Sequence, residues 1–359
     1  MRIAITTGGG DAPGLNAVIR AVVLSATQRG WRCFGIRRGF AGLMEGDGVV
    51  PLGPEEVRGI THLGGTILGT TNRGNPFRWP HRRADGTVEE VDRSDELVAA
   101  FRASGFDALV SLGGDGSLGI AYDLWRKGLP AVGVPKTIDN DVSGTLFSFG
   151  FDTAVATATD AIDKLHSTAE SHERVMVVEL MGRDAGWIAL HSGIAATADV
   201  ILIPEIPFDL DRVCAKILER EARGRRFSIV VVAEGARPVG GAQVLAERRQ
   251  AGGADRLGGI GARVAQGIAE RTGKETRSLV LGHLQRGGSP TTFDRLLSLR
   301  FGAAAVRAIA DGRFGTMTAF TPPIISLVPL AEVVGRPRLV PVDSDTVLTA
   351  RDLGISLGD

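Results

Sequence analysis

The stretch FDALVSLGGDGS, residues 106–117, decides the fold class that we expect for this chain. Its first part is a largely apolar run typical of a buried strand, and the paired glycines after it predict a tight turn. A helix is expected from Leu118 to about Lys127, and Ala131–Val134 predicts the next strand. A strand that leads through a helix to a second strand is the unit from which parallel sheets are built.

The same pattern occurs at the start of the chain. Ile3–Thr6 predicts a buried strand, Gly8–Gly14 a glycine-rich turn, and Leu15–Gln28 a helix whose apolar residues recur at helical spacing. Repeated units of this kind predict a largely parallel sheet with helices on both faces. The expected fold class is therefore α/β.

A second domain is expected after about residue 150, because 359 residues exceed the usual size of one hydrophobic core. A long helical stretch is followed there by three apolar runs that predict strands at Val175–Leu180, Val200–Ile203 and Ser228–Ala233. Further along, we expect a helix at about 259–271, a strand at 279–281 and a long helix at about 293–310. The polar segments 72–93 and 236–255 predict surface loops, and the tail beyond Gly312 is placed only loosely.

Composition narrows the classes of function. Hydrophobic residues make up 43% of the chain and charged residues 23%, as in an ordinary globular protein. The 41 basic residues balance the 41 acidic ones, so no long-range field favours nucleic acid or an anionic membrane. Cys33 and Cys214 are too few for a disulfide framework, and neither a signal-peptide pattern nor a membrane-length apolar run is present. We expect a cytoplasmic protein that binds neither nucleic acid nor membrane.

Both glycine-rich turns lie between a predicted strand and a predicted helix, where unpaired backbone N–H groups and the helix dipole favour an anion. For Gly8–Gly14 the alternative is a turn that serves only chain reversal, since it lacks the lysine of a P-loop. In the second turn Asp115 follows the strand end directly and suits a hydrated Mg²⁺. The alternative there is that Asp115 or Ser117 only caps the next helix.

The segment PKTIDND, residues 135–141, follows the next predicted strand. Thr137, Asp139 and Asp141 alternate, so in an extended segment all three would lie on one face. Two carboxylates at close range repel unless a cation lies between them, which favours an Mg²⁺-phosphate site. Phosphoryl transfer also needs a group that accepts a hydroxyl proton, and we choose Asp139 as this base.

Arginines beside small residues are candidates for a phosphate clamp, because a guanidinium is permanently charged and binds phosphate through two N–H groups. The candidates are Arg174, Arg183, Arg277 and Arg286. Each of them, taken alone, has the alternative of a solvated surface residue or a structural ion pair. His283 has the alternative of a core histidine with satisfied hydrogen bonds.

Taken together, these residues resemble the phosphofructokinase family from Gly8 to about Ala304. The matching segments are GGGDAPGLNA from Gly8, GGTILG from Gly64, GGDGS from Gly113, PKTIDND from Pro135, SHER ending at Arg174, MGR from Met181, AEG from Ala233 and LGHLQRGGSP from Leu281. The GGDG element occurs in other kinases too, whereas TIDND followed by HxQRGG is far more specific. The resemblance implies two Rossmann-like, three-layer α/β/α domains with largely parallel sheets. Residues 1–149 and about 285–335 would bind the nucleotide, and about 150–284 and 336–359 the sugar phosphate.

The resemblance also implies an activity, which is the ATP-dependent phosphorylation of fructose 6-phosphate at its 1-hydroxyl in glycolysis, with Mg²⁺ as cofactor. Asp139 would be the base, Asp115 would hold the metal, and Thr137, Asp141 and Arg183 would complete the catalytic group. The residues implied for the nucleotide are Gly10, Arg73, Gly114, Asp115, Gly116 and Ser117. The residues implied for the sugar phosphate are Thr137, Asp139, Met181, Gly182, Arg183, Glu234, His283 and Arg286. Arg174 and Arg277 would reach the sugar phosphate of a neighbouring subunit, which implies a homodimer or homotetramer.

Two positions bear on the phosphoryl donor. In the family, glycine after GGD goes with ATP, whereas aspartate there fills space that the α-phosphate needs and goes with pyrophosphate. This chain has Gly116 together with Lys136, a lysine typical of the pyrophosphate enzymes that an ATP-using branch also carries. Because a side chain in the nucleotide site is a steric barrier, we give Gly116 the greater weight and predict ATP. The alternatives are a reversible pyrophosphate-dependent enzyme and a catalytically silent sensor of nucleotide or sugar phosphate.

Two departures from the family pattern remain. Arg73 is displaced by one position from the transition-state arginine of the bacterial ATP enzymes. An activator-site arginine is replaced by Leu24, although Arg20 is retained. Regulation by ADP or phosphoenolpyruvate is therefore not expected.

Overall fold

The computed structural model describes residues 1–71, 74–247 and 256–359, and these divide into two compact units. Unit 1 contains Met1–Thr153 and Arg286–Pro337. Unit 2 begins at Ala154 and includes the C-terminal Arg338–Asp359. The sequence analysis placed the corresponding boundaries near residues 149, 285 and 335, and the binding roles that it gave to the two domains stay predictions.

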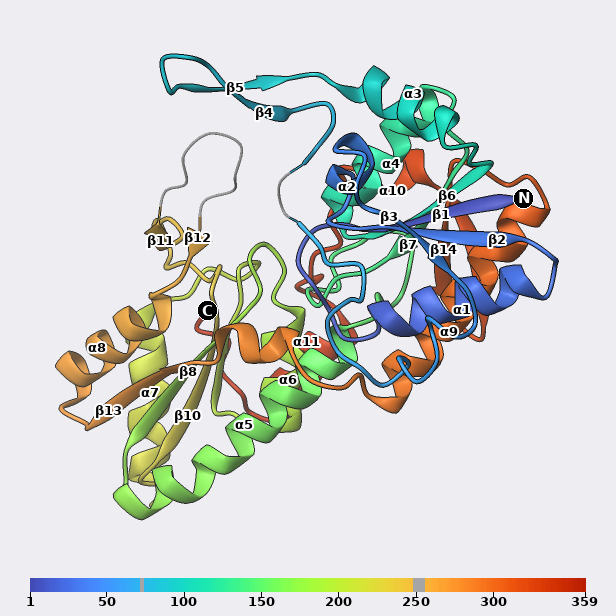
Figure 1. Ribbon diagram of the computed structural model, residues 1–359. Helices are drawn as coiled ribbons and strands as arrows, with labels where there is room; N and C mark the ends of the chain where they lie inside the picture. Colours follow the sequence, from blue (N-terminus) through green and yellow to red (C-terminus); the bar gives the residue numbers. More distant parts are fainter. Residues whose placement is uncertain (72–73, 248–255) are drawn as a thin grey trace. The chain divides into compact units, whose positions relative to one another are not determined.

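Within the described residues, unit 1 has a seven-stranded sheet in the order β15-β14-β7-β6-β1-β2-β3 (Figure 1). The strands are β1 (Arg2–Thr7), β2 (Arg32–Ile36), β3 (Val49–Leu52), β6 (Ala108–Gly113), β7 (Ala131–Pro135), β14 (Thr316–Thr321) and β15 (Ile324–Pro329). The five inner strands are parallel, as expected. The two edge strands, β3 and β15, are antiparallel to their neighbours. The segment beyond Gly312, which the sequence analysis assigned to no particular element, thus supplies β14 and β15 of this sheet.

Helices cover both faces of the sheet in unit 1. They are α1 (Leu15–Thr27), α2 (Ala41–Met44), α3 (Ser94–Ala103), α4 (Asp115–Arg126), α9 (Thr292–Ala310) and α10 (Leu330–Val333). On one face α1 and α9 pack side by side, and their apolar residues share a core with Ile3 and Ile5 of β1. On the other face α3 and α4 form a core with Ala4. Alternate residues of β1 therefore face opposite cores, which confirms the three-layer α/β arrangement.

The α1–α9 contact depends on a glycine in α9. A Cβ atom built on Gly302 would lie 2.7 Å from the carbonyl oxygen of Val18 and 2.7 Å from the Cβ of Ala21. Real Cβ atoms do not approach a backbone so closely, so any larger residue would push the two helices apart. The close approach keeps α1, and with it the glycine turn before α1, in a fixed position.

The described part of the polar segment 72–93 is not the irregular loop that was predicted. It forms an antiparallel pair, β4 (Trp79–Arg82) and β5 (Val88–Val91), which is not joined to the large sheet. Ion pairs link Arg78 with Glu90, at 2.6 Å, and Arg83 with Glu89. The polarity of this segment obscured its strand pattern, because polar residues alternate with few apolar ones in both strands and ion pairs flank the strand β4.

The described residues of unit 2 include a parallel four-stranded sheet in the order β13-β8-β10-β9. The strands are β8 (Val175–Leu180), β9 (Val200–Leu202), β10 (Ser228–Ala233) and β13 (Thr276–Val280). The helices are α5 (Phe151–His172, which begins in unit 1), α6 (Trp187–Ala195), α7 (Leu210–Ala222), α8 (Ile260–Thr272) and α11 (Asp345–Asp352). A short antiparallel pair is formed by β11 (Leu245–Glu247) and β12 (Arg256–Leu257), and a 3₁₀ turn, η1, covers Gly282–Arg286. The predicted strands of this domain are confirmed.

The two edges of the four-stranded sheet differ. At the β9 edge the C-terminal segment pairs with the strand, because the N–H of Ile201 donates to the Ser356 carbonyl at 2.9 Å and the N–H of Ser356 donates to the Asp199 carbonyl at 3.0 Å. At the β13 edge the residues from Arg277 to Val280 are exposed. One edge is therefore covered by the chain's own C-terminal segment, and the other is left open by the residues that the structure describes.

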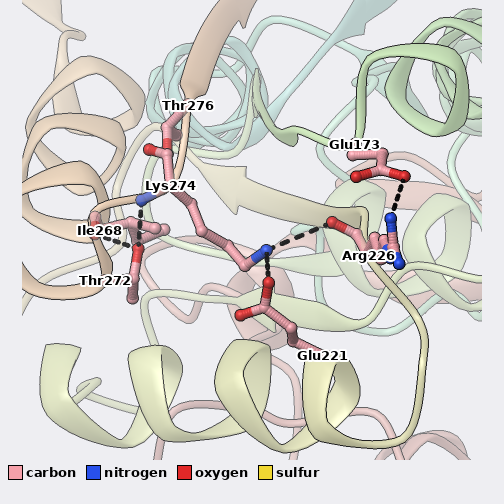
Figure 2. A network of polar contacts seen from close by, with 7 residues as sticks. All are labelled: Glu173, Glu221, Arg226, Ile268, Thr272, Lys274 and Thr276. Carbon is pink, nitrogen blue, oxygen red and sulfur yellow. Dashed lines mark hydrogen bonds and ion pairs between the residues drawn. The ribbon is translucent and has the colours of Figure 1, made fainter.

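The start of β13 is held by a polar network (Figure 2). Lys274 donates to the Glu221 carboxylate at 2.6 Å and to the Arg226 carbonyl at 3.4 Å. Arg226 in turn pairs with Glu173 at 2.8 Å. The network ties the segments after α7 and α5 to the amino end of the open edge strand. It anchors β13, although no strand among the described residues pairs with the outer side of β13.

Candidate active site

Three loops that carry candidate residues leave neighbouring strands at the same level. The register of the parallel strands aligns Thr7 of β1 with Leu112 of β6, and Gly113 of β6 with Pro135 of β7. Because parallel strands end at one edge of the sheet, the segments that follow these residues lie next to one another. This common edge is present in unit 1.

The first glycine turn is shaped by backbone contacts. Gly9 and Gly14 have φ angles of 76° and 111°, in the left-handed region that favours glycine. The Gly9 N–H donates to the Thr71 carbonyl at 3.2 Å, and the Thr70 hydroxyl donates to the Gly9 carbonyl at 2.6 Å. A Cβ on Gly10 would lie 2.9 Å from Nη1 of Arg286. Chain reversal thus accounts for Gly9 and Gly14, and Gly10 lies against the guanidinium group of Arg286.

The second glycine turn opens α4 one turn earlier than predicted. The helix was expected from Leu118, but it begins at Asp115, and Gly114 is its N-cap without a side-chain capping bond. The alternative that Asp115 or Ser117 caps this helix is therefore wrong. The Asp115 carboxylate instead accepts a hydrogen bond from the N–H of Gly335 at 3.0 Å. The free N–H groups of the first turn of α4 open at the edge where the anion is expected.

The PKTIDND segment is not extended, so this expectation was wrong. The chain bends at Ile138–Asp139, and Asn140 has a φ of 53°. The bend is held by the Asn140 side chain, whose amide oxygen accepts the N–H of Ser148 at 3.0 Å. Thr137 still contacts its neighbours, since its hydroxyl oxygen accepts the N–H of Asp139 at 3.1 Å. A turn, rather than the alternation of a strand, brings these polar groups together.

The electrostatics show that the charged groups of unit 1 converge. Burial raises the pKa of Asp141 to about 6, the charge of Asp139 adds to the rise, and hydrogen bonding to the Thr137 hydroxyl opposes it. The Asp115 carboxylate raises the pKa of Asp141 further. Asp115 and Asp139, the two acids on which the phosphoryl-transfer hypothesis depends, are therefore both close enough to Asp141 for their charges to act on its pKa.

Lys136 is buried beneath the first glycine turn, where its ammonium group donates to the Gly10 carbonyl. Burial lowers the pKa of Lys136 to about 8, and the positive charge of Arg286 contributes. The carboxylates of Asp139, Asp11 and Asp141 oppose this shift. Arg286 is itself fixed by a 3.2 Å hydrogen bond from Nη1 to the Asp11 carbonyl. Two cations thus face three carboxylates in a partly dry site.

The donor set fits a magnesium ion that arrives with a nucleotide. Mg²⁺ in such sites takes one or two carboxylates and completes its shell with water and phosphate oxygens. Asp115 and Asp141 are two carboxylates of the required kind, and Oδ1 of Asp141 is buried without a hydrogen-bond partner in the described part of the chain. A buried carboxylate oxygen without a partner, and with a raised pKa, indicates a site short of positive charge.

A small cavity of about 40 Å³ continues from the glycine turns. Its walls include Gly8, Gly9, Phe40, Thr71, Ser117 and Ile120. Gly116 lies at the exposed start of α4, and a Cβ atom on it would meet nothing within 4 Å. Packing therefore does not require glycine there. The sequence analysis missed Phe40 and Ile120, because a lone apolar residue carries no motif. Arg73, expected at the nucleotide, lies outside the described residues.

The sugar-phosphate candidates in unit 2 form two groups, one at each end of the four-stranded sheet. The first group lies at the carboxyl ends of the strands. Met181, Gly182 and Arg183 follow the carboxyl end of β8, and Glu234 follows that of β10. Position 235, directly after Glu234, requires glycine, because a Cβ on Gly235 would lie 1.8 Å from the Arg183 carbonyl oxygen. That carbonyl accepts a hydrogen bond from Gln243 at 3.0 Å. His283, in η1 beyond β13, is exposed and is not a core histidine.

Arg174 and Arg277 lie at the other end of this sheet. Arg174 precedes β8 and Arg277 is near the start of β13, and both form ion pairs with Glu275, at 3.0 and 2.8 Å. The six residues of β8 separate Arg174 from the Met181–Arg183 loop. At a rise of about 3.3 Å per residue, this is a distance of roughly 20 Å. Within one chain the two groups of arginines cannot contact the same sugar phosphate.

Comparisons with known proteins agree with this arrangement. A family model described as phosphofructokinase matches residues 2–309. An ATP-dependent 6-phosphofructokinase of Chloroflexus aurantiacus is 54% identical over 359 residues, covering 100% of this chain and 98% of that protein. A pyrophosphate--fructose 6-phosphate 1-phosphotransferase of Amycolatopsis methanolica is 51% identical over 343 residues, covering 95% and 96%. The crystal structure of Pichia pastoris phosphofructokinase in the T-state has a TM-score of 0.80 and 33% identity, and the match covers 99% of this chain and 37% of that longer one.

Proposed function

The chain belongs to the phosphofructokinase family, and we propose that it transfers the γ-phosphoryl group of ATP to the 1-hydroxyl of fructose 6-phosphate. The products are fructose 1,6-bisphosphate and ADP, as in glycolysis. The observation that carries the proposal is the convergence of Asp115, Asp139 and Asp141 with Lys136 at the carboxyl edge of the unit 1 sheet. A base and a metal site beside a phosphate-binding turn are the parts that this reaction needs.

Asp139 is the base. Its carboxylate takes the proton of the 1-hydroxyl while that oxygen forms a bond to the γ-phosphorus, and the bond from phosphorus to the β–γ bridging oxygen of ATP breaks. Thr137 positions Asp139 through the 3.1 Å hydrogen bond between the Asp139 N–H and the Thr137 hydroxyl oxygen. Asp115, with support from Asp141, would hold the magnesium ion, which would supply positive charge to the phosphate oxygens. The N–H groups at Gly114–Ser117 and the Gly10 turn receive the nucleotide phosphates.

The space in front of Gly116 supports ATP as the donor. An aspartate there would fit the fold, since its Cβ would meet no atom of the chain, but its carboxylate would face the phosphates. The Lys136 ammonium group donates a hydrogen bond to the Gly10 carbonyl beneath the first glycine turn. This position leaves the opposite side of the turn for ATP. Relatives named ATP-dependent reach 54% identity, and those named for pyrophosphate reach 51%.

A two-donor assay tests the proposal. Purified protein is supplied with fructose 6-phosphate and Mg²⁺, and initial rates are compared with ATP and with pyrophosphate. We expect turnover with ATP and its loss when the metal is chelated. Turnover with pyrophosphate alone would establish the reversible pyrophosphate enzyme instead. Binding of ligands without product from either donor would establish a silent sensor, an alternative disfavoured by the presence of a base, which a sensor does not need.

The sugar phosphate has its own set of residues in this proposal. Met181, Gly182, Arg183 and Glu234 contact the sugar, and His283 and Arg286 lie near its 6-phosphate. Arginine suits this role because its planar donor group matches a phosphate. Arg183 is 42% exposed, so its guanidinium is accessible to an anion.

We further propose a homodimer or homotetramer in which Arg174 and Arg277 complete the site of a neighbouring subunit. Their location, a strand length away from Arg183, supports this. So does the open edge of the sheet, where Leu279 is 38% and Val280 57% exposed on β13, because an exposed apolar edge strand normally pairs or is covered. A cytoplasmic location belongs to the same proposal. The structure adds that none of the described helices has the length and apolarity to span a membrane.

A further inference from the structure

Glu205 is a carboxylate of unit 2 that the proposed reaction does not use. It lies three residues beyond the carboxyl end of β9 and joins two segments far apart in the chain. One carboxylate oxygen accepts the N–H of Gly186 at 3.0 Å and the N–H of Val340 at 2.9 Å. The other oxygen lies 3.2 Å from the Gly186 nitrogen. A single side chain therefore ties the C-terminal segment to the residue that precedes α6.

The contact is closely packed. A Cβ on Gly186 would lie 2.4 Å from the Cβ of Ile203 and 3.0 Å from Oε2 of Glu205. Burial raises the pKa of Glu205, and the N–H groups of Val340 and Gly186 oppose the rise. Hydrogen bonds to a partly buried carboxylate are among the stronger ones in proteins, so this junction resists movement.

The next residue is tied to the same segment. The indole N–H of Trp187 donates to the Arg338 carbonyl at 2.9 Å, and the Arg338 guanidinium lies 4.3 Å from the centre of the Trp187 ring. A cation above an indole face adds to the attraction. Gly186 and Trp187 are thus both attached to the C-terminal segment, which is itself paired with β9 through Ser356.

Residues 181–185 lie between this junction and β8. At the β8 side, the Gly182 carbonyl accepts the N–H of Gly235 at 3.0 Å. Within the loop, the Arg183 carbonyl accepts a hydrogen bond from Gln243, and at the far side Gly186 is held by Glu205. The loop that carries Met181, Gly182 and Arg183 is therefore held at both ends, and Glu205 supplies the attachment at its far end.

We infer that Glu205 is a positioning residue for the sugar-phosphate loop, acting through Gly186 and through the C-terminal segment. The inference rests on the proposed function, since it takes the 181–183 loop as the place where fructose 6-phosphate binds. Removing the carboxylate leaves two backbone N–H groups without an acceptor and frees one end of the loop. In the variant the loop must become ordered when the ligand binds, and this ordering costs binding free energy. In the wild type the loop is already ordered in the folded protein. The affinity for the sugar phosphate falls, while the nucleotide site in unit 1 is untouched.

The experiment compares Glu205→Ala, Glu205→Gln and Asp199→Asn with the wild type. Asp199 is the matched control, because it flanks the other end of β9, accepts the N–H of Ile229 at 2.9 Å and has a pKa raised by burial. It lies at the end of the sheet away from the loop. We measure KM for fructose 6-phosphate, KM for the donor, kcat and melting temperature.

We expect Glu205→Ala to raise KM for fructose 6-phosphate about tenfold, the scale of one lost charged hydrogen bond, with kcat and donor KM within about twofold of wild type. Glu205→Gln, which keeps one acceptor oxygen, should recover part of the loss. Asp199→Asn should lower the melting temperature without a change in either KM. If Glu205→Ala fails to fold, the Gln variant carries the test alone, with an intermediate rise in KM expected.

Two results overturn the inference, namely an unchanged KM for fructose 6-phosphate in both Glu205 variants and an equal rise in the Asp199 control. Failure of the proposed function looks different, because then the wild type itself turns over neither donor. In that case calorimetric titration of the same proteins with fructose 6-phosphate replaces KM, and weaker binding by Glu205→Ala supports the inference. Absence of any binding by the wild type overturns both.

Discussion

In unit 1 the charged residues at the carboxyl edge of the sheet are largely withdrawn from water. Lys136 is 3% exposed, and burial shifts its pKa and that of Asp141 toward neutrality, to about 8 and about 6. In unit 2 the arginines expected to hold the sugar phosphate remain in contact with solvent, and Arg183 and Arg277 are 42% and 60% exposed. One unit thus holds its charges in a desolvated cluster, and the other presents them at the surface.

The difference matches the two tasks of a phosphotransferase. Proton abstraction and charge neutralisation depend on groups that are fixed before the substrate arrives, in a site of low dielectric. Phosphate capture needs accessible cations, which lose their water only when the ligand binds. At the amino edge of the unit 2 sheet, the exposure of Arg277 has a further explanation, since its partner in the proposal is a second subunit. The comparison therefore predicts that chemistry fails when unit 1 is altered and that binding fails when unit 2 is altered.

The largest effect is expected from Asp139→Ser. Loss of a general base costs about 10²–10⁴-fold in kcat, whereas KM for both substrates should change little because the binding groups remain. Steady-state kinetics measure both quantities, and Asp123→Asn, an exposed change on α4, is the control. A variant that retains near-normal turnover would remove Asp139 from the role of base.

Asp294 tests whether burial of carboxylates in unit 1 also governs stability. Its carboxylate accepts the N–H and the hydroxyl of Thr153 at 2.8 and 2.6 Å, and burial raises its pKa to about 6 from an ordinary value of 3.8. A folded-state pKa above the unfolded one means that the folded state binds the proton more tightly. Protonation of Asp294 therefore stabilises the folded state. This stabilisation is present in full below about pH 4 and is lost as pH rises through about 6.

We therefore expect the stability of wild type, relative to Asp294→Asn, to fall by about 2–3 kcal/mol between pH 4 and pH 7. Urea unfolding of both proteins at several pH values measures the difference, and subtraction removes the contributions of all other titrating groups. Parallel pH profiles for the two proteins would show that Asp294 is not a buried acid with a raised pKa.

Gly116→Asp tests whether the open space at the start of α4 is reserved for the nucleotide. We expect about a hundredfold loss of kcat/KM with ATP, because a carboxylate would face phosphate oxygens, and no loss of melting temperature, because the side chain meets no atom of the chain. Gly113→Ala is the contrasting variant. Its Cβ would lie 2.2 Å from the Cβ of Ser117, so that protein should lose stability. Full ATP activity in Gly116→Asp would show that this position does not select the donor.

The smallest effect is expected at the open edge of unit 2. Val280→Lys should dissociate the oligomer, because lysines brought together at an interface between copies repel, and KM for fructose 6-phosphate should rise about tenfold as the arginines of the neighbouring subunit are lost. Sedimentation velocity measures the assembly, with Leu218→Lys on the exposed side of α7 as the control. A wild type that is monomeric and fully active would contradict the shared site.

Much of the architecture followed from local patterns. Apolar runs ending in glycine predicted β1, β6, β8 and β10, because a strand buried on both faces is apolar throughout and its turn needs a residue free to reverse the chain. The same patterns placed Asp115, Lys136 and Asp139 just beyond strand ends. The edge strands β3 and β15 and the β4–β5 pair were not predicted, since strands that are only partly buried lack a continuous apolar run.

The sequence by itself determined the fold class and the residues that follow the strand ends, because both depend on short-range rules of hydrophobic spacing and turn geometry. Tertiary structure decided how those residues meet. The bend at Asn140 replaced the predicted extended segment, and the register of β1, β6 and β7 brought the three loops together. Only folding could set the shifted pKa values of Lys136 and Asp141 or separate Arg174 from Arg183, because burial and charge proximity arise from contacts between residues far apart in the chain.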